Sequence, residues 1–194
     1  MLKNQLRPAI VVTVVLMVIT GLVYPGFVTA VAQLVFTRQA NGSLVARDGR
    51  VIGSVLIGQQ FARAEYFHAR PSAAGAGYDD TLSTGTNKGP TDAKLADTLI
   101  AGAVDSAVKL DGAVKGQVPA DLVTSSGSGL DPHISPAAAE LQVARVARVR
   151  GLDPAVVRAL VAQHTEGRQF GFFGEPRVNV LLLNLALDSL ARAP

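Results

Sequence analysis

The chain has 194 residues, a formal net charge of +3 at pH 7 and a charged fraction of 17%. This charged fraction lies below the roughly 25% typical of soluble domains, and the length allows one domain with an appendage. The basic residues are scattered, whereas a nucleic-acid-binding domain needs a concentrated basic face, so we expect no nucleic-acid partner. Cysteine is absent, which excludes disulfides and thiol chemistry.

The first predicted element is a membrane-spanning helix. No charged residue occurs between Arg7 and Arg38. A bilayer core requires about 20 apolar helical residues, and a charge at its centre costs roughly 2.5–3.5 kcal/mol on insertion scales. The sequence therefore predicts an N-terminal segment, residues 1–37, with a span over about residues 10–34, followed by a soluble domain, residues 38–194. Pro8 is expected in the first helical turn.

A cleaved signal peptide is the alternative interpretation of this segment. Signal peptides have an apolar region of about 7–15 residues, and this run is longer, so we favour an uncleaved span. The stretch Tyr24–Gly26 contains a proline and is expected to kink the helix rather than end it. Lysine and arginine residues are nearly balanced on the two sides of the span, so their count does not set its orientation.

A β-hairpin and a long loop follow the span. Asp48-Gly49 is a two-residue turn signal, and the apolar, β-branched residues Val51–Ile57 form the predicted second strand. The Gly-, Ser-, Thr- and Asp-rich stretch Ala74–Asp92 predicts a loop of a length that is usually functional or mobile.

The rest of the chain carries helix signals. We predict helices over residues 93–110, capped by Thr91 or Asp92, and over residues 137–150, where Ser135 is the N-cap and Pro136 is the first helical residue. Further helices are predicted over residues 155–166, after Asp153-Pro154, and from near Pro176 onward. The predicted fold class is α+β, with a small sheet near the membrane end and several helices.

Three kinds of chemical site are considered. Gly85–Thr91 has the glycines of a phosphate-binding loop, but Lys88 precedes Gly89 and no apolar strand leads into it, which favours a solvated turn. The histidines His68, His133 and His164 lack the close spacing of metal ligands.

The segment Gly127–Pro136 raises the third alternative, a serine hydrolase, because Asp131, His133 and Ser135 alternate within it. A catalytic triad is defined by spatial roles, however, and no strand–turn–helix nucleophile motif is present. We interpret the segment as an ordered helix-entry loop, in which Asp131 and Ser135 accept backbone hydrogen bonds. A rigid polar loop of this kind suits docking against another protein.

Three long blocks of the sequence, residues 66–91, 118–152 and 164–187, closely resemble the KdpC family, the small subunit of the bacterial Kdp potassium-transporting ATPase. The resemblance implies three partners: a channel-like potassium-binding subunit, a P-type ATPase subunit and a very small hydrophobic subunit. It also implies a plasma-membrane location, with a cytoplasmic N-terminus and an extracytoplasmic soluble domain.

The function implied by this resemblance is that of a non-catalytic subunit that assembles or stabilises a high-affinity potassium uptake complex. No nucleotide motif is visible, so ATP and potassium are expected to be handled by the complex, and any effect on ATP affinity is expected to be indirect. Without the resemblance, the residues also fit a membrane-anchored exported binding or sensor module.

The candidate contact residues come from both parts of the chain. Small residues in the span allow close approach of partner helices and lipid, and the adjacent acids Asp79 and Asp80 are expected to attract cations. The full set of candidate partner contacts is Gly21, Gly26, Ala30, His68, Arg70, Asp79, Asp80, Asp131, His133, Ser135, Glu175 and Arg177.

Overall fold

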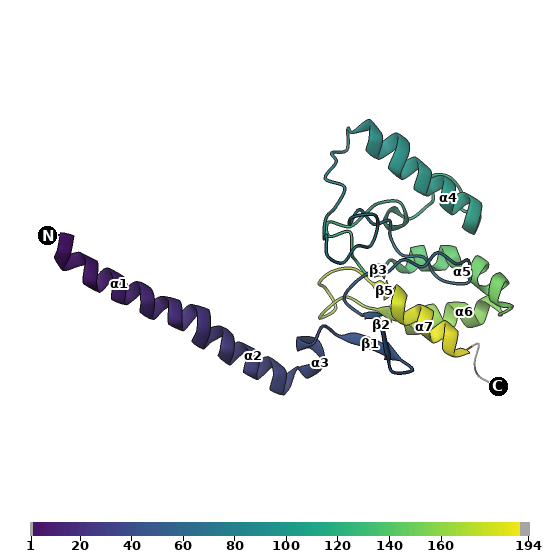
Figure 1. Cartoon of the computed structure of the whole chain (residues 1–194). Coiled ribbons are helices and arrows are strands. Elements are labelled where there is room, and N and C mark those ends of the chain that lie inside the picture. Colours follow the sequence, from purple (N-terminus) through teal and green to yellow (C-terminus); the bar gives the residue numbers. More distant parts are fainter. Residues whose placement is uncertain (1, 191–194) are drawn as a thin grey trace. The chain divides into compact units, whose positions relative to one another are not determined.

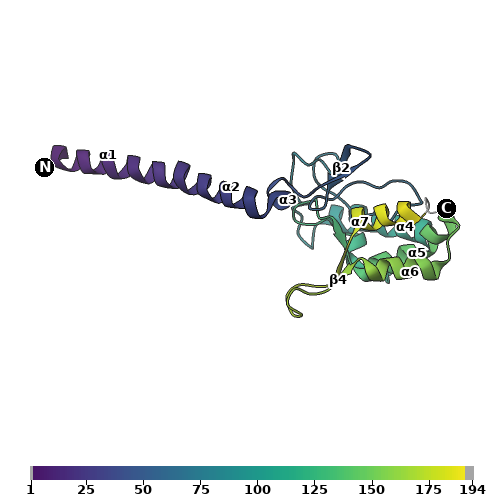
Figure 2. The same cartoon turned by 90° about the horizontal axis from the view of Figure 1, so that it is seen from below.

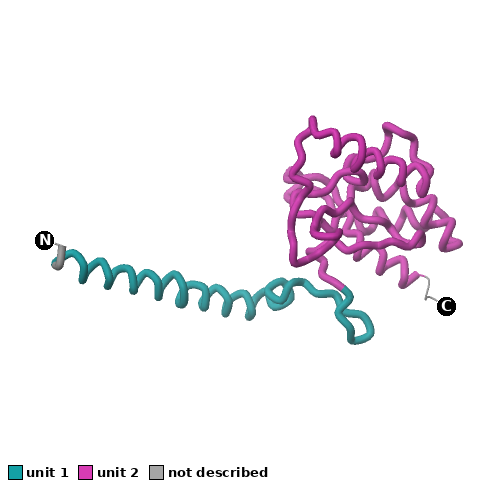
Figure 3. Tube along the Cα trace, turned by 45° about the horizontal axis from the view of Figure 1, so that its top comes forward, with its two compact units in different colours: residues 1–52 teal, residues 53–194 magenta. Residues whose placement is uncertain are grey.

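The computed structural model describes residues 2–190 of the chain (Figure 1). The chain divides into two compact units, Met1–Ile52 and Gly53–Pro194 (Figure 3). The expected domain division after residue 37 falls where the long N-terminal helix ends, and it stays a prediction.

The first unit contains the expected long apolar helix. Helix α1 (Leu2–Val18), the π-helical turn η1 (Ile19–Val23) and α2 (Tyr24–Val35) follow one another without a break. The stretch Asn4–Val35 contains an 18-residue window with a mean hydropathy of 2.3 and is long and apolar enough to cross a membrane. The short helix α3 (Thr37–Ala40) comes next.

The two prolines of this helix behave differently from each other. Pro8 lies inside α1, so its predicted place in the first turn is wrong; the helix begins six residues earlier, at Leu2. Pro25 follows the π-helical turn, in which the Tyr24 N–H donates to the Ile19 carbonyl five residues back. A proline ring collides with the carbonyl four residues before it, and a π-helical turn is one way to relieve that collision. The helix therefore continues through Tyr24–Gly26.

The predicted hairpin is confirmed as strands β1 (Leu44–Arg47) and β2 (Arg50–Ser54). Asp48 has φ 52° and Gly49 has φ 78°, which are the positive values that a type I′ turn requires at both central positions. The second strand ends earlier than predicted. Leu56 N–H donates to the Ser54 hydroxyl at 3.1 Å, which turns the chain.

The second unit contains the predicted helices, with shifted ends. Helix α4 (Ala101–Asp111) continues the π-helical stretch η2 (Lys94–Ile100), and Asp92 accepts from Leu95 N–H as the expected cap. Helices α5 (Pro136–Arg150) and α6 (Pro154–Gln163) pack side by side (Figure 2). The other helical elements described in this unit are the 3-10 turn η3 (Ala120–Leu122) and α7 (Val180–Leu190).

A second sheet, which the sequence did not predict, lies in this unit. It consists of β3 (His133–Ile134), β4 (Thr165–Glu166) and β5 (Arg177–Asn179), in the antiparallel order β3-β5-β4. Two boundary predictions are consequently wrong: α6 ends at Gln163 rather than Glu166, and the last helix begins at Val180 rather than near Pro176. The residues that had been assigned to the two helix ends pair with each other instead, Thr165 with Val178 and Glu166 with Arg177.

The core of the second unit forms where α5, α6 and α7 meet the extended segment that contains Phe67. Two buried amides hold this segment as a neighbouring strand would. Asn184 accepts from Phe67 N–H at 2.8 Å and donates to its carbonyl at 2.9 Å. Gln142 makes the equivalent pair with His68, at 2.7 and 3.1 Å. Helix side chains therefore satisfy backbone groups that would otherwise be buried unpaired.

Candidate functional site

Half of the candidate contact residues line one open pocket of about 520 Å³ in the second unit. They come from the segment that follows Phe67, from the loop that enters α5, and from the residues at and just before the start of β5. These residues are Arg70, Asp131, His133, Ser135, Glu175 and Arg177. The structure thus brings together side chains that lie far apart in the sequence.

Asp131 is the electrostatic centre of this pocket. One carboxylate oxygen accepts from His133 N–H at 3.0 Å and lies 3.2 Å from His133 Nδ1, and the other accepts from Arg70 at 3.0 Å. Burial by itself would raise the pKa of Asp131, but the hydrogen bonds from His133 and the positive charge of Arg70 outweigh it and lower the pKa. Asp131 therefore carries a negative charge at neutral pH, and the positive charge of Arg70 balances it.

Ser135 is confirmed as the N-cap of α5. Its hydroxyl oxygen accepts from Ala138 N–H at 3.0 Å. Its hydroxyl and its backbone N–H both donate to the carboxylate of Asp121, at 3.0 and 2.6 Å. The Ser135 proton is thus directed to Asp121, while the His133 ring faces Asp131, so the three alternating residues do not form a serine–histidine pair.

We predict that Ser135→Ala lowers the free energy of unfolding by about 1–2 kcal/mol, because the helix loses its cap and Asp121 loses a donor. Denaturant titration of the detergent-solubilised chain measures this loss. Ser189→Ala is the control, since that exposed hydroxyl donates only to the carbonyl of Leu185 and its removal should change stability by less than about 0.5 kcal/mol. Equal losses in the two variants would contradict the proposed cap.

His68 does not join the other candidates at the Asp131 pocket. It lines a second pocket of about 360 Å³, to which Arg70 also contributes, and its Nε2 lies 3.2 Å from the carbonyl oxygen of Arg63. Burial lowers the pKa of His68, and the nearby positive charge of Arg145 lowers it further. His68 is therefore held in its neutral form.

This lowered pKa predicts acid sensitivity. The unfolded chain binds a proton at His68 near pH 6.5, whereas the folded chain binds it only at lower pH, so the stabilisation is complete above pH 6.5 and is lost as pH falls through the folded pKa. We expect the free energy of unfolding to fall between pH 7 and pH 5, and to fall less in His68→Gln. Urea titrations at both pH values test this. If the free energy of unfolding falls by the same amount in His68→Gln as in the wild type, groups other than His68 cause the acid sensitivity.

The acid pair Asp79 and Asp80 also lies outside the Asp131 pocket. Asp79 accepts from the backbone N–H and the hydroxyl of Thr81, at 3.0 and 2.6 Å, and these bonds lower its pKa. Asp80 is exposed. Asp79 thus stabilises a turn of its own loop, and the two acids are not directed at a common point by any contact among the described residues.

The small residues of the span lie on the exposed surface of the long helix. Gly21 belongs to η1, whereas Gly26 and Ala30 belong to α2 and are four residues apart, on one face. A side-chain carbon added at either glycine would meet nothing within 4 Å. This face is therefore open to the close approach of another helix.

The other chemical candidates have structural roles. Lys88, in the glycine-rich loop, pairs with Asp92 at 2.7 Å, and Asp92 caps the following helix. His164 lies at the end of α6, where its Nδ1 approaches the Leu160 carbonyl at 3.0 Å. Among residues 2–190, no group of three or more potential metal ligands comes together.

Sequence reasoning named Glu175 but missed the exposed phenylalanines of the loop that joins β4 to β5 (Figure 2). Two ion pairs brace its base: Arg168 with Glu175 at 2.7 Å, and Arg177 with Glu166 at 2.9 Å. The loop between them exposes three phenylalanines. The signal that could have found this feature is the stretch of three phenylalanines and two glycines within residues 170–174, which no helix or strand pattern explains.

Comparison with known proteins gives a consistent family assignment. The family model described as "KdpC: K+-transporting ATPase, c chain" matches residues 6–189. The chain is 64% identical over 191 residues to the potassium-transporting ATPase KdpC subunit of Gemmatimonas aurantiaca, covering 98% of this chain and 95% of that one. It is 52% identical over 194 residues to the subunit of the same name from Koribacter versatilis, covering 100% and 98% of the two chains.

Proposed function

The chain belongs to the KdpC family of K+-transporting ATPase c chains, and on this premise we propose that it is a non-catalytic subunit that assembles and stabilises an ATP-driven potassium uptake complex. Its proposed protein partners are a channel-like potassium-binding subunit, a P-type ATPase subunit and a very small hydrophobic subunit. The near full-length match to potassium-transporting ATPase KdpC subunits supports this proposal.

The main observation behind the proposed non-catalytic role is that the central polar side chains of the Asp131 pocket are hydrogen-bonded to one another or to Asp121. Asp131 is paired with Arg70 and His133, and the Ser135 hydroxyl is committed to Asp121. A serine nucleophile is typically activated by a histidine, whereas the Ser135 hydroxyl caps α5 and donates to Asp121, and the His133 ring faces Asp131. The pocket therefore offers a rigid, shaped polar surface, which suits contact with a partner subunit.

We propose that the long N-terminal helix anchors this surface to the plasma membrane. An uncleaved single pass, with the N-terminus in the cytoplasm and the second unit outside, agrees with the apolar stretch Asn4–Val35 and with the orientation implied by the family. The open face at Gly26 and Ala30, together with the exposed Gly21, can pack against the spans of partner subunits and against lipid.

The chain is proposed to bind neither ATP nor potassium as its own cofactor. ATP hydrolysis belongs to the P-type subunit in this proposal, and potassium binding belongs to the channel-like subunit. An effect of this chain on ATP affinity would then be a coupling free energy transmitted through the assembled complex.

Affinity purification of the tagged chain in mild detergent, from cells that express all the subunits, tests the proposal. We expect the channel-like and ATPase subunits in the eluate, and a lower recovery with Asp131→Asn, because the pocket loses its central charge. Glu140→Gln is the matched control, since it removes a carboxylate from an exposed ion pair on α5. A chain that elutes alone would overturn the proposal and would favour an exported binding or sensor module.

A further inference from the structure

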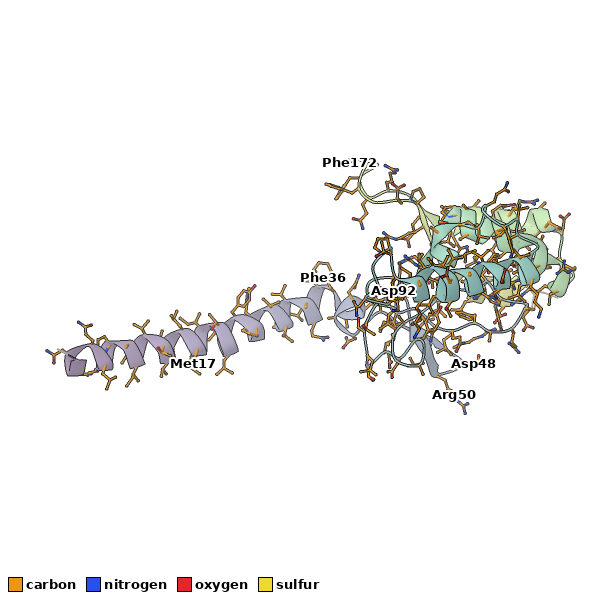
Figure 4. All side chains as sticks on the ribbon, turned by 90° about the horizontal axis from the view of Figure 1, so that it is seen from above. Met17, Phe36, Asp48, Arg50, Asp92 and Phe172 are labelled. Carbon is orange, nitrogen blue, oxygen red and sulfur yellow. The ribbon has the colours of Figure 1, made fainter. Side chains whose placement is uncertain are left out.

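The loop between β4 and β5 holds three phenylalanines in solvent. Phe170 is 89% exposed, Phe172 64% and Phe173 58%, although each is apolar enough to be expected in a core. Figure 4 shows Phe172 on this loop, away from the packed helices of the second unit. We call these three side chains the aromatic tip.

The loop that carries the aromatic tip is ordered. The backbones of Gln169 and Phe173 exchange two hydrogen bonds of 2.9 Å, and the rings of Phe172 and Phe173 lie 4.2 Å apart between centroids. Below them, Arg168 Nη2 donates to both carboxylate oxygens of Glu175, at 2.8 and 2.7 Å. The tip is therefore arranged before any partner binds, which lowers the conformational cost of binding.

The backbone of the loop is also strained at Phe170. Phe170 has φ 52°, in the left-handed region that bulky residues rarely occupy. Strain of this kind is typical of binding sites, where the surrounding structure holds a residue in a disfavoured conformation. The strained residue is also the most exposed of the three phenylalanines.

The charges around the tip favour a protein over a lipid surface as its partner. Segments that bind membranes combine apolar residues with unpaired lysines and arginines, which attract anionic headgroups. In this loop Arg168 is paired with Glu175 and Arg177 with Glu166, so no net positive charge surrounds the tip. Aromatic residues are enriched, and charged residues are depleted, at the core of protein interfaces.

The tip is continuous in sequence with the Asp131 pocket. Glu175, Pro176 and Arg177 line that pocket and begin two residues after Phe173. An apolar anchor beside a polar, partly exposed surface is the usual composition of a specific protein interface.

We propose that the aromatic tip docks into an apolar recess on the extramembrane surface of another protein subunit of the transporter. This inference rests on the proposed function and adds to it the surface through which the chain is held. Phe170, Phe172 and Phe173 supply the buried anchor in this contact, and the residues of the Asp131 pocket supply its polar edge.

Photo-crosslinking in intact membranes identifies what the tip touches. Phe172 is replaced by benzoylphenylalanine, which keeps an aromatic ring, in the full chain expressed with all the subunits. We expect a crosslinked band that contains this chain and one other subunit. A crosslink to lipid alone, or no crosslink in a complex that still assembles, would overturn the proposal.

The variant Phe170→Ser/Phe172→Ser/Phe173→Ser measures how much the tip contributes. We expect at least a tenfold lower recovery of partner subunits in detergent, with the variant chain still in the membrane fraction. The control Leu82→Ser/Val149→Ser/Val156→Ser removes three exposed apolar side chains elsewhere in the second unit and should leave recovery unchanged. Unchanged recovery with the tip variant would refute the docking surface alone, whereas a wild-type chain that recovers no partner would refute the proposed function itself.

Discussion

Replacing Arg145 with alanine is expected to lower the free energy of unfolding by about 3–5 kcal/mol, the loss typical of breaking a buried ion pair. Arg145 and Asp111 are almost completely buried, and Arg145 Nε lies 2.6 Å from the Asp111 carboxylate. The same guanidinium donates to the carbonyls of Ala64 and Tyr66, at 2.5 and 2.8 Å, and to the Gln142 amide oxygen at 2.8 Å. The substitution therefore leaves the buried Asp111 carboxylate and the carbonyls of Ala64 and Tyr66 without this donor, while the Gln142 oxygen keeps only the His68 N–H.

Denaturant titration of the detergent-solubilised chain measures this effect, with Arg158→Ala as the control. Arg158 also forms a 2.6 Å ion pair from a helix, with Glu140, but both side chains are about half exposed. Exposed pairs contribute less than about 1 kcal/mol. If the two arginine variants lose the same stability, Arg145 does not hold α4, α5 and the segment at residues 64–66 together.

Gly129→Ala is expected to cost about 3 kcal/mol, through backbone strain and steric overlap. Gly129 has φ 69°, where a side chain costs roughly 1–2 kcal/mol. An added carbon would also overlap the Thr84 carbonyl oxygen and lie 2.8 Å from the Ala74 nitrogen, and crowding of this kind costs about 1–3 kcal/mol. Because the obstructing atoms belong to the backbone, they cannot rotate away.

Gly127→Ala provides a control within the same loop. A carbon added at Gly127 would meet nothing within 4 Å, and the backbone there is outside the left-handed region. We expect this variant to unfold within about 0.5 kcal/mol of the wild type, as surface substitutions usually do. Comparable losses at both glycines would show that the loop is not packed against residues 74 and 84.

Features set by neighbouring residues were predictable from the sequence. The type I′ turn at Asp48-Gly49 and the caps at Ser135 and Asp153 each depend on contacts within three residues, so the residue types alone identify them. The long apolar helix is equally local, because its signal is the absence of charge over one continuous stretch.

Features that depend on distant pairing were not predictable. Strands β3, β4 and β5 are two or three residues long, too short for an alternating pattern, and they form only through pairing between distant segments. Gln142, Arg145 and Asn184 resemble surface residues of amphipathic helices, yet they are buried because they satisfy backbone groups far away in sequence.

The candidate site shows both kinds of feature. Asp131, His133 and Ser135 are close in sequence and were recognised as one loop. The contact of Arg70 with Asp131 joins residues 61 positions apart, and the Asp121 carboxylate that binds Ser135 had no motif to mark it. The pairing of Asp79 with Thr81 is a turn contact two residues apart, which the residue types allow but which we did not predict.

Potassium uptake from limiting external potassium, in a strain that lacks its own copy of this chain, tests the central claim most directly. The strain is supplied either with the full chain or with residues 38–194 exported behind a cleavable signal peptide. We predict that the full chain restores high-affinity uptake and that the released domain does not, because the domain acts only when the N-terminal helix holds it at the transporter. Equal uptake with the released domain, or no uptake with either form, would contradict a membrane-held subunit of the potassium transporter.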